Sequence, residues 1–127
     1  MKVSVKEFGA AVLSFEAEVL GTMEKRRNKF AYGIAMSVLN DKVSPLIEKM
    51  ADGDGMIDCD ALKKHIDAGM DACGGSFDIS PDISPALGPI ATAFGIDVET
   101  TIGRAYVNKF FNETIVKIAK AAADAAN

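Results

Sequence analysis

The residues of this chain best suited to chemistry are four aspartates that lie close together. They are Asp52, Asp54, Asp58 and Asp60. Carboxylate oxygens are the ligands that Ca²⁺ prefers, and the ion binds about six to eight oxygens in proteins. Gly53 follows Asp52 and Gly55 follows Asp54, and this alternation of aspartate and glycine favours a tight turn. The spacing therefore indicates a candidate calcium site.

The segment Met50–Ala61 resembles an EF-hand calcium loop. The family's acidic-x-acidic-Gly-x-Ile-acidic core is formed here by Asp52, Asp54, Gly55, Ile57 and Asp58. The resemblance implies a weak calcium site whose donors are the side chains of Asp52 and Asp54, the backbone carbonyl of Met56, a water held by Asp58, and Asp60 reaching inward.

This segment departs from the family at two positions. Met50 stands at the first position, which is normally Asp, and Ala61 stands at the twelfth, which is normally a bidentate Glu. About half of the usual oxygen shell remains. EF-hands also work in pairs that are joined through the position of Ile57, and the sequence contains no second loop of this kind. The alternative is a plain turn, in which Asp58 or Asp60 caps the following helix.

Other chemistry has little support in the sequence. It contains no GxxxxGK[ST] phosphate loop, no HExxH zinc motif and no GxSxG nucleophile motif. His65, the single histidine, has no catalytic partner nearby in the sequence. Cys59 and Cys73 flank a predicted helix, which would hold them about 21 Å apart, too far for a disulfide. We therefore expect no enzymatic activity and no cofactor other than weakly bound Ca²⁺.

A basic cluster occupies the second predicted helix. Its members are Lys25, Arg26, Arg27 and Lys29. A nucleic-acid surface needs more basic residues aligned with aromatic ones, and the chain as a whole carries a net charge of −4. We expect no nucleic-acid binding, and a local surface for an acidic partner remains open.

The elements that position the aspartates follow from the apolar spacing. The acidic segment is expected to join a short helix that starts at Ser44-Pro45 to a helix with Leu62, Ile66, Met70 and Cys73 on its buried side. Residues 56–58 predict a short strand. Residues 76–80 alternate in polarity and predict a second strand that could pair with the first.

The rest of the chain predicts further helices. A helical apolar stripe runs from Val5 to Val19 and is extended by Leu20 and Met23, with a break or bend of the helix expected at Gly21-Thr22. A second helix with Phe30 on its apolar side is expected to end at Asn40-Asp41. Pro81, Pro85 and Pro89 predict an irregular loop followed by a short helix over 89–94. The last helix is expected to open with Asp97 as N-cap and to carry Ile102, Tyr106, Phe110, Phe111, Ile115, Ile118 and Ala122 on its apolar face.

These elements predict one mainly α domain over residues 1–127, with five or six helices and at most a short two- or three-strand β element. No apolar run is long enough for a membrane span, and the best N-terminal one is bracketed by Glu7 and Glu16, so we expect a cytoplasmic protein without a membrane partner. Amphipathic helices at both ends predict a non-enzymatic module for protein association, as a homo-oligomer or within a larger assembly. Calcium binding is the alternative function.

Overall fold

The computed structural model describes residues 1–95 and 101–126. The helices are α1 (Val5–Gly21), α2 (Arg26–Met50), α3 (Cys59–Ala72), α4 (Ser80–Phe94), α5 (Arg104–Lys109), the π-helical turn η1 (Phe110–Thr114) and α6 (Ile115–Ala126). The strands are β1 (Lys2–Ser4), β2 (Met56–Asp58), β3 (Ser76–Asp78) and β4 (Thr101–Gly103). The predicted fold class, a small mainly α domain with a minor β element, is confirmed.

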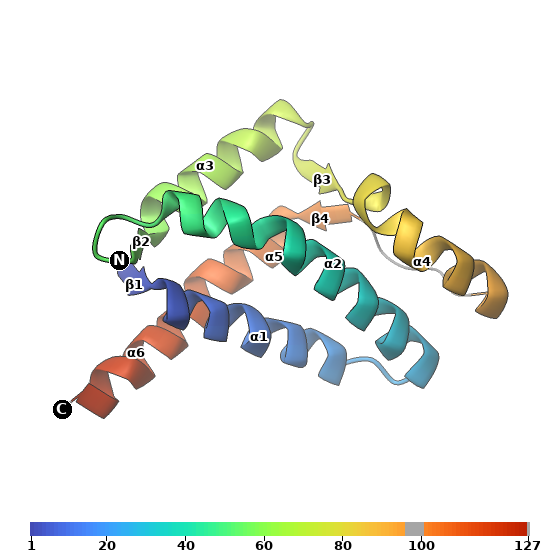
Figure 1. The fold of residues 1–127 in the computed structure, drawn as a ribbon, viewed down its shortest axis with the longest axis horizontal. Helices are drawn as coiled ribbons and strands as arrows, with labels where there is room; N and C mark the ends of the chain where they lie inside the picture. Colours follow the sequence, from blue (N-terminus) through green and yellow to red (C-terminus); the bar gives the residue numbers. More distant parts are fainter. Residues whose placement is uncertain (96–100, 127) are drawn as a thin grey trace.

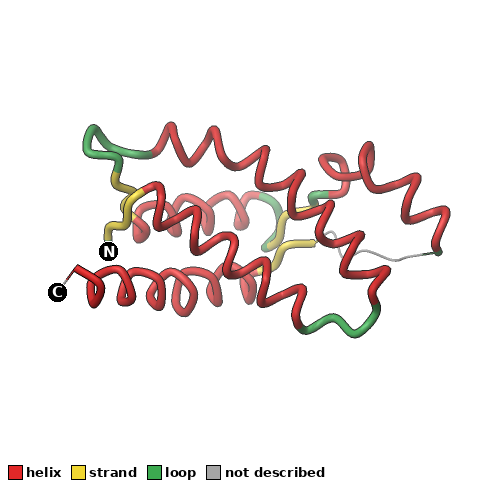
Figure 2. Tube along the Cα trace, turned by 60° about the horizontal axis from the view of Figure 1, so that its bottom comes forward, coloured by secondary structure: helices red, strands yellow, loops and turns green. Residues whose placement is uncertain are grey.

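The strands form two separate antiparallel pairs (Figure 2). β1 pairs with β2 through Val3 and Ile57, and β3 pairs with β4 through Phe77 and Ile102. The expectation that residues 76–80 pair with the extended residues around Ile57 is therefore wrong. The N-terminal strand, which the periodicity did not predict, takes that edge instead.

Strands lead almost directly into helices, and polar side chains cap two of these junctions. The Ser4 hydroxyl accepts a hydrogen bond from the Glu7 N–H at 3.0 Å at the start of α1. The Asp58 carboxylate does the same for α3, where it accepts from the N–H groups of Asp60 at 3.1 Å and Ala61 at 3.2 Å. These bonds satisfy N–H groups that have no partner within their own helix.

The main core lies where α1, α3 and the C-terminal helix meet (Figure 1). Its buried members are Val3, Phe8, Ala11, Ile47, Ile57, Cys59, Leu62, Met70, Val107, Phe111 and Ile115. Phe110 packs edge-to-face on Phe8 and Phe15 of α1, with ring centroids 5.5 and 5.6 Å apart. Helices from the two ends of the chain therefore build this core together.

A second, smaller core holds α4 mainly against α2. Its buried residues are Ala31, Ala35, Ile83 and Leu87. The two alanines let the helices approach closely, and the two larger side chains of α4 lie against them one helical turn apart. We call α4 together with the part of α2 that it covers the α2/α4 arm.

Proline breaks fewer helices than the sequence predicts. α2 continues through Asn40-Asp41 and through Pro45, so that the expected break and second start at Ser44 are wrong. The Ser44 hydroxyl donates a hydrogen bond to the Asn40 carbonyl at 2.9 Å within the continuous helix. Pro45 itself is exposed, so the backbone carbonyl that loses its N–H partner lies near water.

α4 likewise replaces the expected irregular loop and short helix over 89–94. Pro81 sits in the first turn, where its missing N–H costs nothing. Pro85 and Pro89 follow at steps of four, so all three rings lie on one exposed face, opposite the buried Ile83 and Leu87. The helix ends at Gly95, whose φ of 62° is the left-handed conformation that glycine adopts readily.

The C-terminal helix starts later than predicted. Ile102 lies in β4, and the helix begins at Arg104. The expected N-cap, Asp97, lies outside the described residues. At η1 the hydrogen bonds span five residues instead of four, so the turn holds one extra residue. The extra residue rotates the apolar face of the helix after η1 relative to the face before it. Phe110 and Phe111 are adjacent in sequence, yet both join the core there.

Candidate functional site

Asp52 organises the acidic turn through its own hydrogen bonds. Its Oδ1 accepts from the N–H groups of Asp54 at 2.9 Å and Met56 at 3.0 Å, and its N–H donates to the Met56 carbonyl at 2.9 Å. The Met56 and Asp54 N–H groups hold the pKa of the Asp52 carboxyl below its usual value. Gly55 closes the turn with φ of 73°.

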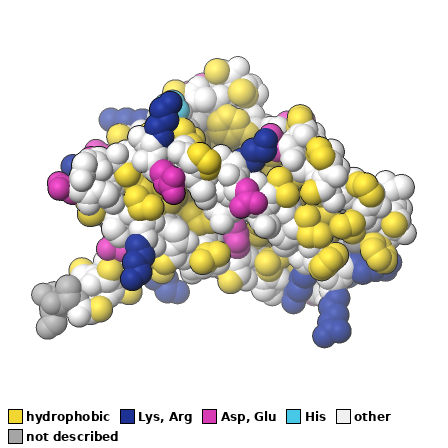
Figure 3. Space-filling model, in the orientation of Figure 1, with side chains coloured by type: hydrophobic (Ala, Val, Ile, Leu, Met, Phe, Trp, Pro, Cys, Tyr) yellow, Lys and Arg dark blue, Asp and Glu magenta, His cyan; other side chains and the backbone are white. Residues whose placement is uncertain are grey.

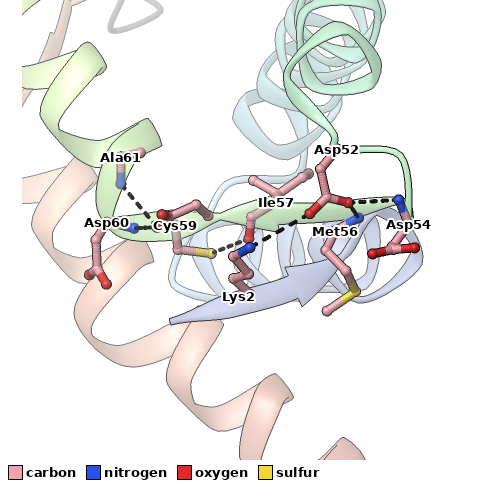
Figure 4. A network of polar contacts seen from close by, with 9 residues as sticks. Lys2, Asp52, Asp54, Met56, Ile57, Cys59, Asp60 and Ala61 are labelled. Atoms are coloured by element: carbon pink, nitrogen blue, oxygen red, sulfur yellow. Dashed lines mark hydrogen bonds and ion pairs between the residues drawn. The ribbon is translucent and has the colours of Figure 1, made fainter.

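Two further predicted ligands lie at the junction of β2 and α3, Asp58 as the last residue of the strand and Asp60 in the first turn of the helix. Asp58 caps α3, as the alternative reading of the sequence predicted. Asp60 forms an ion pair with the N-terminal ammonium group of Met1, which lowers the pKa of the Asp60 carboxyl. Figure 4 shows Asp52 and Asp54 at one end of β2 and Asp60 at the other.

This arrangement places the five predicted calcium donors at opposite ends of β2 instead of around one point. A three-residue strand spans about 10 Å, whereas Ca²⁺ ligands lie about 2.5 Å from the ion. Within residues 1–95 and 101–126 no three His, Cys, Asp or Glu side chains are grouped to hold a metal ion. A shell made from these donors requires Asp58 to leave its helix cap and Asp60 to leave Met1. Calcium binding by Asp52, Asp54, Met56, Asp58 and Asp60 stays a prediction.

A different set of residues meets at the free end of the α2/α4 arm. Arg26, Arg27 and Phe30 begin α2, and Phe94 ends α4. Together they line a hollow of about 210 Å³. The Arg27 guanidinium donates to the Phe94 carbonyl at 3.4 Å, which ties the start of one helix to the end of the other. We call these four residues, with Lys25 and Lys29, the arm tip.

Both aromatic side chains of the arm tip face solvent. Phe30 is 62% exposed and Phe94 is 53% exposed. Figure 3 shows hydrophobic side chains gathered over the end of the molecule that α2 and α4 form, with Lys and Arg side chains along its lower edge. Apolar surface rimmed by charge marks interaction sites more often than scattered exposed residues do.

Sequence reasoning found only part of this surface. It placed Phe30 on the buried side of α2, but the buried stripe is centred on Ala31 and Ala35, one position further on. The basic cluster next to Phe30 was the available signal. Phe94 lies far along the chain, and only the packing of α4 on α2 brings it to the same hollow.

The cysteines and the histidine occupy separate places. Cys59 is buried at the start of α3, and burial raises the pKa of its thiol. Cys73 is exposed at the end of α3, although the stripe predicted it as buried, and both cysteines are free thiols. His65 is exposed on α3.

Comparison of the chain with protein-family models, with curated proteins and with solved structures found no match. In the part of the chain that the structure describes, no helix combines the length and the apolar character that a bilayer crossing requires.

Proposed function

We propose that this chain is a non-enzymatic protein-association module and that the α2/α4 arm is its binding element. The observation that supports the proposal most directly is the pair of exposed phenylalanines, Phe30 and Phe94, around one hollow at the end of the arm. The partner is either a second copy of the chain or another protein.

The architecture of the arm explains why this surface is left open. A helix pair buries one stripe of each helix, and a further layer is needed to cover the rest. The four buried residues of the arm lie along the contact between α2 and α4, whereas the two phenylalanines lie at its end. Burying a phenylalanine side chain stabilises by about 1.5–3 kcal/mol, so a partner that covers both gains substantial affinity.

Two other large exposed apolar side chains lie on helices outside the arm. Leu13 lies on α1 and Val116 lies on α6, each 43% exposed or more. Single exposed apolar residues are common on proteins and need no partner. These two positions therefore serve as internal controls.

Site-directed photo-crosslinking in the cells that make the protein tests the proposal. A photoreactive phenylalanine analogue replaces Phe30 in one variant, Leu13 in a second and Val116 in a third. We expect a discrete protein adduct from position 30 and none from the two control positions. The absence of a discrete adduct at all three positions would overturn the proposed function, whereas an adduct only at 13 or 116 would keep protein association and reject the arm.

A further inference from the structure

The arm tip has a charge as well as a shape. We infer that it binds an acidic peptide segment of a partner protein, with one apolar side chain of the segment between Phe30 and Phe94 and its carboxylates on Arg26 and Arg27. This inference rests on the proposed function, because it names the partner chemistry for the same arm.

Among the residues that the structure describes, no carboxylate pairs with the cations of the arm tip. These cations are Lys25, Arg26, Arg27 and Lys29. Arg27 does bind the Phe94 carbonyl, which fixes its guanidinium at the rim of the hollow. Guanidinium groups bind carboxylates in a two-pronged geometry that is stronger and more specific than that of an ammonium.

The start of α2 adds to this positive potential. The helix has no acidic residue in its first turn and no side-chain cap, and Lys25 stands at the N-cap. The partial positive charge of a helix N-terminus normally attracts carboxylates, and here it is surrounded by cations of the chain itself. An acidic partner relieves this repulsion, whereas an apolar partner alone leaves it in place.

The hollow has the size of a side-chain anchor. Its volume of about 210 Å³ lies below the roughly 300–1,000 Å³ of small-molecule pockets. Interface hot spots are commonly single side chains that fill such hollows, with polar contacts around them. An acidic segment with one aromatic or aliphatic residue matches both the hollow and its rim.

The charge distribution favours a short segment over an extended polyanion. The whole chain carries −4, and the segment 24–29, with four cations and Glu24, carries +3, so the remaining residues carry −7. A nucleic acid or an anionic membrane extends well past the tip, over a remainder of the chain whose net charge repels it. A peptide of a few residues does not.

The test is a selection from a random peptide library against the full chain, followed by affinity measurements on the peptides obtained. We expect peptides in which an apolar residue is flanked by Asp or Glu. Peptides without acidic residues, or no enriched peptide at all, would overturn the inference.

Matched variants then locate the binding. We expect Arg26→Glu/Arg27→Glu and Phe30→Ala each to weaken the selected peptide by about tenfold or more, the loss typical of a hot-spot residue. The controls are Lys6→Glu/Lys49→Glu, with the same change in charge, and Leu13→Ala, which likewise truncates an exposed apolar side chain, and both should stay within about twofold of wild type. All the substituted side chains are exposed. Arg27→Glu removes the hydrogen bond to the Phe94 carbonyl, but the buried contacts between α2 and α4 remain in every variant, so the fold is retained. Equal weakening by the controls would reject the arm tip as the site.

Two further measurements separate the other occupants. Light scattering of the wild-type chain over a range of concentrations detects self-association, and a fluorescent single-stranded oligonucleotide detects nucleic-acid binding. If no acidic peptide is selected and self-association is lost in Arg26→Glu/Arg27→Glu, the arm tip binds a second copy of the chain. If oligonucleotide binding is lost instead, the arm tip binds a nucleic acid. Either result would show that the inference is wrong. An adduct from photo-crosslinking without any selected acidic peptide would keep the proposed function and reject this partner chemistry.

Discussion

At the scale of single residues, the aspartates of the Met50–Ala61 segment have divided structural tasks. Asp52 holds the turn, Asp58 caps α3 and Asp60 pairs with Met1. Asp54 lies in the same turn and contributes its N–H to the Asp52 carboxylate. This division makes it possible to separate a structural aspartate from a calcium ligand by mutation.

The Asp52 carboxylate should stabilise the fold in a pH-dependent way. Its pKa is lower in the folded chain than in the unfolded chain, where it is about 4. The stabilisation is therefore complete above the unfolded pKa and is lost as the pH falls through the folded pKa. Asn can accept the same hydrogen bonds without charge, so Asp52→Asn should be less stable than wild type at pH 7, and the gap should close in acid. Urea denaturation between pH 2.5 and 7 measures it, with Asp54→Asn as control. A gap that does not change with pH would contradict the prediction.

Calcium binding can be tested separately, by an NMR titration of the wild-type chain and of Asp54→Ala. If the segment binds Ca²⁺, the amide signals of Gly53, Gly55 and Ile57 should shift during an NMR titration and saturate below about 1 mM. Asp54→Ala should remove these shifts. Its effect on stability should appear only when calcium is present, because the carboxylate of Asp54 takes no part in the turn hydrogen bonds described above. No shift in wild type, or an equal stability change with and without calcium, would leave the segment as a turn.

At the scale of elements, local signals predicted helix faces better than helix lengths. The apolar stripe of α1, the stripe of α3 apart from Cys73, and the break at Gly21 follow from residues near one another in sequence, and the structure has them. The errors at Pro45, Pro85 and Pro89 have one physical cause. All three prolines are exposed in the structure, so each carbonyl that loses its N–H partner lies near water, and this exposure is a property of the folded chain that the local sequence does not show.

The pairing of strands and the arm tip were hidden for a related reason. Val3 with Ile57, Phe77 with Ile102, and Phe30 with Phe94 are each brought together by packing between distant segments. The acidic turn and the cap at Asp58 were predictable because all their partners lie within a few residues.

The prolines of α4 provide a prediction at this scale. Replacing Pro85 or Pro89 by Ala restores a backbone hydrogen bond in the helix interior, where proline costs about 3 kcal/mol. The greater freedom of the unfolded chain offsets about 0.4–1 kcal/mol of this. Each change should therefore stabilise the fold by about 2–3 kcal/mol in urea denaturation. Pro81→Ala, in the first turn, is the control and should change stability little. Equal effects at all three positions would contradict this account.

At the scale of the whole molecule, helices from the two ends of the chain pack against each other. α1 and the C-terminal helix share an aromatic cluster in which Phe15 contacts both Tyr106 and Phe110, and β1 pairs with β2 beside it. Elements from residues near 3, 57 and 110 therefore meet in one core. Damage to this core should affect the whole fold, whereas damage to the arm tip should affect binding alone.

Two positions on α1 test this division. Phe8 is 4% exposed and packs on Phe110, and Leu13 is 61% exposed. Phe8→Ala should destabilise the fold by about 3–5 kcal/mol because it leaves a cavity in the core. Leu13→Ala, on the same helix, should stay within about 0.5 kcal/mol of wild type. Thermal denaturation followed by circular dichroism measures both, and a similar loss from the two changes would show that the core is not where the structure puts it.

The separate small core of the arm has a consequence for how the molecule opens. The buried residues of α4 contact α2 and take no part in the main core, so α4 can detach while α1, α3 and the C-terminal helix stay packed. Backbone amides of α4 should then exchange with deuterium at a lower free energy than those of α1. Such an opening uncovers Ala31 and Ala35 and separates Phe94 from Phe30, so any ligand of the arm tip should slow the exchange of α4.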